Sequence, residues 1–326
     1  MTSTDGNIRL IGIGGYGSTV IEDLLLDEEW QTDCVLLAMD HQTESTSSAQ
    51  QVIRVDESVI ESTTEDQERD LNELKVQIRQ ALRGTEVSVI TSGIGVPATN
   101  QLVLLVAQIA KELRSWVIVF VTTPFAFEGD RRTQKAYEAI EQLRSIAQVT
   151  VELSNRRIRG FLGPTARMTE AFNASATIIK DAFRGLKNMV DQNGVVNLDL
   201  EDLCSALDKK GLAAVGRGEA RGEDKIETAV LKAISNPLLE NSELKSAQTL
   251  IVMLQSGNDF RIGSLEDINV ILRNLFSEKA DILIGVTSDT DFYSSAVATI
   301  MALGIPCTPQ PELRSEPPKL AWRKRE

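Results

Sequence analysis

The sequence predicts an α/β fold with three parts: an N-terminal domain built on a doubly wound parallel sheet, a long central helix and a smaller C-terminal α+β domain. Three observations support this prediction. Short apolar runs alternate with segments of helical periodicity up to residue 153, as expected of a parallel sheet covered by helices on both faces. Apolar residues then recur at helical spacing over 169–190. Beyond residue 200 the regular alternation ends.

The N-terminal half contains five apolar runs that we expect to be buried parallel strands, with helical segments between them. The runs are 7–13, 34–39, 87–91, 116–121 and 149–153. The expected helices are 20–26, 65–82, one that starts at 101 and one that ends near 147. The short apolar stretch 52–55 only interrupts a polar region.

The C-terminal half mixes both kinds of segment, which predicts an α+β domain. We expect helices at 200–210, 224–234 and 265–276, strands at 249–254, 282–287 and 296–303, and a glycine-rich turn at 216–218. Five of the nine prolines lie beyond residue 304, which predicts a disordered tail. The expected divisions are therefore 1–168, 169–193 for the central helix, 194–304, and 305–326 for the tail.

Composition argues against several classes of function. The chain of 326 residues has 47 acidic and 34 basic residues and a net charge of −13, so its surface repels nucleic acid and anionic membranes. No apolar run approaches the ~20 residues needed to span a bilayer, and no signal-peptide pattern is present. One histidine and three scattered cysteines argue against a transition-metal site. We therefore expect a cytoplasmic protein without nucleic-acid partner, direct membrane insertion or bound metal.

The first strand runs into a glycine turn, Gly14-Gly15-Tyr16-Gly17, at the start of a helix. Glycine lets the backbone approach a phosphate, and the amides at a helix start stabilise its charge. The alternative is a tight turn without a ligand. Asp40, at the end of the next strand, would suit a ribose hydroxyl. These residues alone leave a mononucleotide site and a nicotinamide site open.

Two further loops, 92–100 and 123–132, are expected beside the glycine turn. Both follow predicted parallel strands, and binding sites in such sheets lie at the carboxyl ends of the strands. After the central helix, Asn193-Gly194 supplies a helix end. The segment 195–203, here called the acidic loop, then presents three carboxylates and an amide. One interpretation is a helix start capped by Asp199.

Three passages, 11–17, 123–132 and 197–203, resemble the tubulin/FtsZ superfamily on its FtsZ side. The resemblance extends over nearly the whole chain, from Ile8 to about Gly304. It implies a GTP-binding domain, a central helix and a second domain stacked beside it. It also implies head-to-tail polymers in which the acidic loop of one subunit completes the GTPase site of the next.

The resemblance assigns roles to individual residues. It implies nucleotide contacts for the glycines of two loops: Gly14, Gly15, Gly17, Gly93 and Gly95. Glu128 and Arg132 would face sugar and phosphate, with a surface ion pair as the alternative interpretation. Asn155 and Phe172 would contact guanine. The catalytic residues would position the attacking water in the neighbouring subunit: Asn197, Asp199 and Asp202.

Three features depart from the family pattern. The glycine-and-threonine run expected after the third strand is replaced by Gly95-Val96-Pro97-Ala98, in which Pro97 has no amide hydrogen. Carboxylates at 56–57 and 61–70 replace a loop that would face the terminal phosphate. Ala176 stands where the family has an Asn or Asp that reads guanine. These changes predict that GTP and GDP bind weakly.

Three functions follow as hypotheses. The first is a divergent FtsZ-like protein of cell division or cell shape, which forms filaments alone or with an FtsZ-family relative while its GTP binding and hydrolysis are weak or lost. The second is an active polymerising GTPase. The third, a nicotinamide-dependent enzyme, rests on the glycine turn and Asp40. The segment 317–325 combines apolar and basic residues, so it either docks a membrane tether protein or is a solvated tail.

Overall fold

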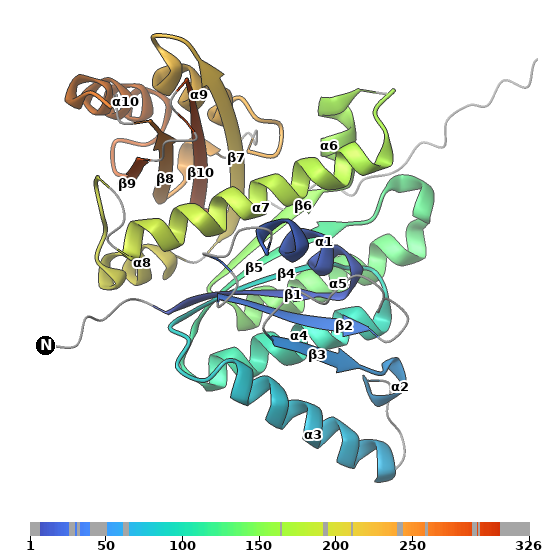
Figure 1. Cartoon of the computed structure of the whole chain (residues 1–326). Coiled ribbons are helices and arrows are strands. Elements are labelled where there is room, and N and C mark those ends of the chain that lie inside the picture. The colour runs from blue at the N-terminus through green and yellow to red at the C-terminus, as the bar shows by residue number, and fades with distance from the viewer. Residues whose placement is uncertain are drawn as a thin grey trace, which may run out of the picture.

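The chain is seen in a computed structural model that describes residues 7–25, 30, 33–39, 51–60, 65–163, 165–191, 195–209, 211–239, 244–257, 260–288, 292 and 294–306. The predicted fold class is confirmed. A mostly parallel sheet with helices on both faces, a long central helix and a smaller α+β part follow one another along the chain (Figure 1). Asp40, Asn193, Gly194 and the tail from 307 lie outside the described residues.

The strands of the described residues join in the order β3-β2-β1-β4-β5-β6-β7-β10-β8-β9. Their bounds are β1 (Ile8–Ile13), β2 (Cys34–Met39), β3 (Gln51–Val55), β4 (Val87–Gly93), β5 (Trp116–Thr123), β6 (Val149–Ser154), β7 (Leu212–Arg221), β8 (Thr249–Ser256), β9 (Asp281–Ser288) and β10 (Ser295–Ile305). The first six strands in this order, β3-β2-β1-β4-β5-β6, are parallel to one another, and β6 pairs with β7 through Val151 and Ala213. Strand β10 runs antiparallel to β7 and β8.

Helices flank the sheet on both sides. Their bounds are α1 (Gly14–Leu24), α2 (Glu57–Ile60), α3 (Glu65–Ala81), α4 (Pro97–Glu112), α5 (Asp130–Ile146), α6 (Asn155–Leu162), α7 (Met168–Val190), α8 (Leu200–Leu207), α9 (Lys225–Ile234) and α10 (Ile262–Leu275), with the 3₁₀ turns η3 (Ala126–Glu128) and η4 (Leu244–Ser246). Because strand residues alternate between faces, Leu10 packs with α1 and α7, whereas Ile11 packs with α3, α4 and α5. Helices α9 and α10 cover the C-terminal strands.

Helix α7 lies between the two halves of the sheet (Figure 1). Its Phe183 is fully buried and belongs to the same apolar cluster as Met253 of β8. A Cβ atom at Gly185 would lie 2.7 Å from Met253, so glycine lets that side chain reach the helix. Asp181 of α7 forms an ion pair with Arg217 of β7. These contacts make the predicted central helix the element that joins both halves.

Some predicted elements differ from the structure. The predicted glycine turn at 216–218 is wrong, because these residues lie within β7. A Cβ atom at Gly218 would lie 2.1 Å from the carbonyl oxygen of Ala229, so the glycine allows α9 to pack directly on the strand. The stretch 51–55 is a strand, since it pairs with β2 in full register. Strand β10 extends to Ile305, where the tail was expected.

Candidate nucleotide site and acidic loop

Four loops meet at one edge of the sheet. They follow β1, β4, β5 and β6, which are neighbouring parallel strands, so all four leave from carboxyl ends. The predicted residues lie at these connections: Gly14, Gly15 and Gly17 in the first turn of α1, Gly93 at the end of β4, Gly95 between β4 and α4, Glu128 in η3 and Asn155 at the start of α6. Phe172 joins them from the first turns of α7, through ring contacts with this edge. The structure therefore brings together the residues that the sequence predicted for the nucleotide.

The turn between β1 and α1 is shaped by close packing. A Cβ atom at Gly17 would lie 2.6 Å from backbone atoms of Gly12, so both glycines allow α1 to approach the sheet. Gly14 has a φ angle of 68°, which favours glycine. No side chain caps the start of α1, at Ile13. The first amides of α1 therefore remain available to an anion.

The loop between β4 and α4 is held by internal contacts. The amide of Gly95 donates a hydrogen bond to Oδ1 of Asn100, at 2.8 Å. Asn100 Nδ2 in turn donates to the carbonyl oxygen of Lys135, at 3.0 Å. Gly95 has a φ angle of 121°, and Pro97 begins α4 without an amide hydrogen. This loop therefore offers fewer free donors than a glycine-rich phosphate loop would.

The carboxylate of Glu128 is engaged within the chain. Its Oε1 accepts a hydrogen bond from the amide of Phe125, at 2.8 Å, and its Oε2 pairs with Arg132, also at 2.8 Å. The surface ion pair that was the alternative interpretation is thus present. At the end of β3, Asp56 accepts a hydrogen bond from the amide of Ser58, which lowers the pKa of its carboxyl group. Asp56 is exposed at the same carboxyl edge of the sheet.

Aromatic rings pack beside the glycine turn. The Phe172 ring lies 6.4 Å from Tyr16 and 5.8 Å from Phe125, between ring centroids. The Tyr16 hydroxyl donates to Ser175 Oγ, at 2.7 Å. A Cβ atom at Gly93 would lie 3.2 Å from the Tyr16 Cβ, so this glycine makes room for the tyrosine. Sequence reasoning missed Tyr16, although it is the one bulky residue in the glycine turn.

Asn155 starts α6 directly after β6 and is 3% exposed. Its side-chain Oδ1 is buried, and within the described residues it has no hydrogen-bond partner. A buried acceptor without a partner costs free energy, so such an atom is unusual in a native protein. A ligand that donates a hydrogen bond at this point would satisfy it.

The acidic loop is fixed by its backbone. Val195 donates from its amide to the carbonyl of Val286, at 2.7 Å, and Leu198 donates to Met189, at 2.8 Å. Asp199 precedes α8, but its side chain makes no capping hydrogen bond, so the predicted cap is wrong. In the part of the chain that the structure describes, the exposed carboxylates of Asp199 and Asp202 have neither a hydrogen bond nor an ion pair.

The acidic loop and the carboxyl edge lie at opposite ends of α7 (Figure 1). From Phe172 to Asp191 the helix advances by roughly 30 Å, at the usual rise per residue. Asn197, Asp199 and Asp202 therefore lie too far away to act on a ligand bound by their own glycine turn. Any chemistry they perform involves another molecule.

The arrangement matches two family models in chain order. The one described as the GTPase domain of the tubulin/FtsZ family matches residues 7–163, and the one described as the C-terminal domain of the FtsZ family matches residues 211–306. The chain belongs to the tubulin/FtsZ family.

Relatives and solved structures agree with this membership. The cell division protein FtsZ of Coxiella burnetii is 27% identical over 306 residues, which are 92% of this chain and 79% of that protein. The FtsZ of Pseudomonas aeruginosa is 27% identical over 311 residues, covering 91% and 77%. An FtsZ mutant from M. jannaschii has a TM-score of 0.80 at 23% identity and covers 91% of both chains. CetZ1 from Haloferax volcanii, a GDP-bound monomer, has a TM-score of 0.74 at 15% identity, covering 93% of this chain and 95% of that one.

A GTPase domain of the tubulin/FtsZ family implies that GTP or GDP binds. The residues present fit a nucleotide in part. The uncapped start of α1 and the unpartnered Oδ1 of Asn155 suit phosphate and base. The engaged Gly95 amide, Pro97 and the exposed Asp56 oppose a triphosphate. Because the glycine turn belongs to a domain of this GTPase family, it no longer supports the hypothesis of a nicotinamide-dependent enzyme.

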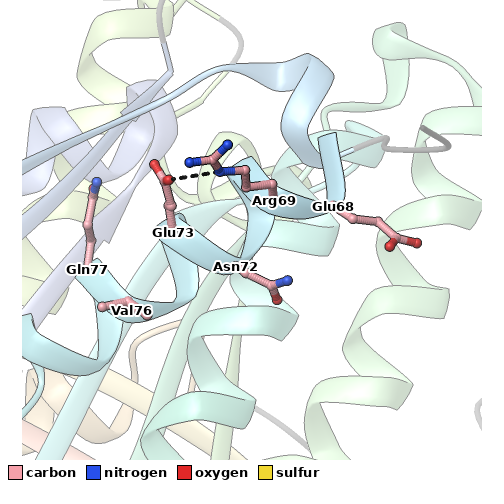
Figure 2. Close-up of a pocket in the computed structure, with 6 residues that line it drawn as sticks. All are labelled: Glu68, Arg69, Asn72, Glu73, Val76 and Gln77. Carbon is pink, nitrogen blue, oxygen red and sulfur yellow. Dashed lines mark ion pairs between the residues drawn. The ribbon is translucent and has the colours of Figure 1, made fainter. Parts of the chain in front are cut away.

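Two surface hollows of this tubulin/FtsZ family member lie away from the glycine turn. One, of about 640 Å³, is lined by α3, where Arg69 and Glu73 form an exposed ion pair (Figure 2). The other, of about 590 Å³, lies beside α8 and is lined by Trp116 and Cys204 among others. Within the described ranges, no helix is long and apolar enough to cross a bilayer. In the same ranges, no three His, Cys, Asp or Glu side chains gather as metal ligands would.

Proposed function

We propose that this chain is an FtsZ-like cytoskeletal protein that forms or joins head-to-tail filaments, in cell division or cell shape, and that its own GTP binding and hydrolysis are weak or lost. One observation carries the proposal. Among the described residues, the exposed carboxylates of the acidic loop have no hydrogen-bond or ion-pair partner, whereas in the loop after β4 the Gly95 amide already donates to Asn100. The relatives are named as cell division proteins, and one similar structure is titled an FtsZ dimer.

The loss of phosphate donors supports weak binding. Pro97 has no amide hydrogen, and the Gly95 amide already donates to Asn100. A hydrogen bond to a charged group contributes ~1.5–3 kcal/mol. The loss of two such bonds corresponds to a weakening of roughly 10²- to 10⁴-fold in affinity.

The charges at the two ends of the molecule support head-to-tail contact. The carboxyl edge exposes arginines from two helices: Arg131, Arg132, Arg156, Arg157 and Arg159. The other end of α7 carries the acidic loop. A contact between unlike ends of identical subunits propagates into a filament. Complementary charge on those ends favours this encounter over contacts between like ends.

The same loop suits a copolymer. A subunit with a weak nucleotide site of its own still presents Asp199 and Asp202 to a relative that holds GTP. There the carboxylates would orient a water for attack on the terminal phosphate, as phosphoryl transfer requires. Homopolymer and copolymer with an FtsZ-family relative both use the acidic loop as the contact.

An active polymerising GTPase is the second candidate. It is favoured by the uncapped start of α1 and by the buried Oδ1 of Asn155, which has no hydrogen-bond partner among the described residues, because both groups would gain from a bound nucleotide. In this case the β4–α4 loop would still bind the phosphates in its altered form.

A nucleotide titration separates the two candidates. We expect a fluorescent GTP analogue to show no saturation at low micromolar concentration, and purified protein to release little phosphate from GTP. Saturation in that range, with GTP turnover that rises as the protein assembles, would support the active GTPase instead. Pelleting with and without GTP then shows whether assembly of the chain depends on nucleotide.

The divisions 1–168, 169–193 and 194–304 and the role of the tail also remain proposals. For the tail we propose that the segment from 317 docks a membrane tether protein. Deletion from Glu316 onward should leave assembly in vitro unchanged and abolish localisation of the filaments in cells. Localisation that persists without these residues would refute a docking role.

A further inference from the structure

Tyr16 crosses from α1 to α7 within the candidate nucleotide site. It is the third residue of α1, and its hydroxyl donates to Ser175 Oγ on α7, at 2.7 Å. Ser175 is fully buried and donates in turn to the carbonyl oxygen of Phe172, at 2.9 Å. A chain of hydrogen bonds thus fixes the tyrosine side chain against the first turns of α7.

The ring of Tyr16 is enclosed on several sides. Phe172 lies beside it at 6.4 Å between centroids, with the two planes tilted by 58°. On β4, a Cβ atom at Gly93 would lie 3.2 Å from the Tyr16 Cβ, which is a tight contact, so the glycine gives the tyrosine room. The tyrosine side chain is partly buried, and this burial raises the pKa of its hydroxyl above its ordinary value.

The Tyr16 ring lies between α1 and α7, beside Phe172. The amides of the first turn of α1 are the donors for phosphate, and Tyr16 belongs to that turn. A base attached to those phosphates finds an aromatic surface in Phe172, because bases stack on aromatic rings. The Tyr16 ring already packs against Phe172. Base and tyrosine therefore compete for the same surface.

We propose that Tyr16 is the residue that sets nucleotide affinity in this chain: its ring takes the place of a purine base between α1 and α7. The proposal rests on the proposed weak binding of GTP and supplies a cause separate from the β4–α4 loop. Removal of the ring opens the space beside Phe172, while the amides of α1 and the acceptor of Asn155 stay in place.

The test compares four variants with the natural chain by titration with a fluorescent GTP analogue and with unlabelled GTP as competitor. Tyr16→Ala removes the ring and keeps a good helix former, and Tyr16→Val is a smaller change for use where the alanine variant unfolds. Tyr16→Phe keeps the ring without the hydroxyl, and Ser175→Ala removes only the hydrogen-bond partner. Circular dichroism and a thermal melt of each protein establish that it is folded.

We expect Tyr16→Ala to bind the analogue at least tenfold more tightly than the natural chain, and GTP to displace the analogue. Tyr16→Val should gain less, and Tyr16→Phe and Ser175→Ala should bind as weakly as the natural chain. Folded Tyr16→Ala and Tyr16→Val proteins that gain no affinity would overturn the role of Tyr16 and leave the proposed weak binding intact. Tight binding by the natural chain would instead overturn both.

Discussion

The contact between Asn100 and the β4–α4 loop leads to a prediction about stability. The Asn100 side chain is 8% exposed and accepts from the Gly95 amide while donating to the Lys135 carbonyl. The change Asn100→Ala removes both hydrogen bonds and leaves the buried Gly95 amide without its partner, whereas the Lys135 carbonyl keeps its helical hydrogen bond within α5. Because α4 and α5 are joined through this side chain, the loop should also lose its fixed position.

The expected cost has two parts. The buried Gly95 amide left without a partner costs ~1–3 kcal/mol, and loss of the hydrogen bond to the Lys135 carbonyl adds ~0.5–1.5 kcal/mol, so the total is about 2–4 kcal/mol. For a domain of this size we expect the midpoint of thermal unfolding to fall by about 4–16 °C. Circular dichroism at 222 nm or differential scanning fluorimetry measures this change.

Gln101→Ala is the matched control, because Gln101 is the exposed neighbour on the same helix. Its free energy of unfolding should change by no more than about 0.5 kcal/mol, as for other surface substitutions, so its melting midpoint should stay close to that of the natural chain. An Asn100→Ala protein that melts together with the Gln101→Ala protein would show that Asn100 does not hold the loop. The Gly95 amide would then be free to donate to a phosphate. Of the two donors whose loss supports weak binding, only the missing amide hydrogen of Pro97 would remain.

Three further outcomes are expected. Gly218→Ala should lower the melting midpoint, because a Cβ atom there would lie 2.1 Å from a backbone oxygen of α9, whereas Gly160→Ala meets nothing within 4 Å and should not lower it. Burial raises the pKa of the Glu152 carboxyl group in the folded protein, so the fold loses stability as pH rises from the ordinary pKa of a glutamate towards the raised one. Glu152→Gln should therefore melt at a higher temperature than the natural chain at pH 7. Below about pH 4, where both states are protonated, the two proteins should melt together. Burial, and to a smaller extent the charge of Glu86, raise the pKa of the Cys204 thiol to about 11. Its alkylation by iodoacetamide at pH 8 should therefore be roughly 100-fold slower than that of an unperturbed thiol, and peptide mass spectrometry measures this rate.

The sequence predicts most of the fold because the patterns that carry it are local. The buried strands and the amphipathic α7 show their periodicity within a few residues of each position. Strand β3 was missed because it is only five residues long, three of them partly or fully exposed, and is flanked by polar sequence. The glycines of β7 indicated a turn because the sequence alone does not show that α9 packs directly on them.

The sequence predicted where the candidate site lies, but not the contacts that its residues make. The predicted glycines do lie at the carboxyl edge, yet Gly93 makes room for Tyr16 and the Gly95 amide is bound to Asn100. These roles depend on contacts between residues far apart in the chain, which no spacing rule reveals. Tyr16 itself carried a signal, since a large ring in a glycine turn needs space from another element.

The central claim is that the acidic loop is the contact by which one subunit engages the next, and charge reversal tests it most directly. Asp199→Lys combined with Asp202→Lys should abolish filaments in pelleting assays and electron microscopy. The melting midpoint should stay close to that of the natural chain, because neither exposed carboxylate makes a capping hydrogen bond or an ion pair among the described residues. Filaments that persist unchanged in the double variant would contradict the claim.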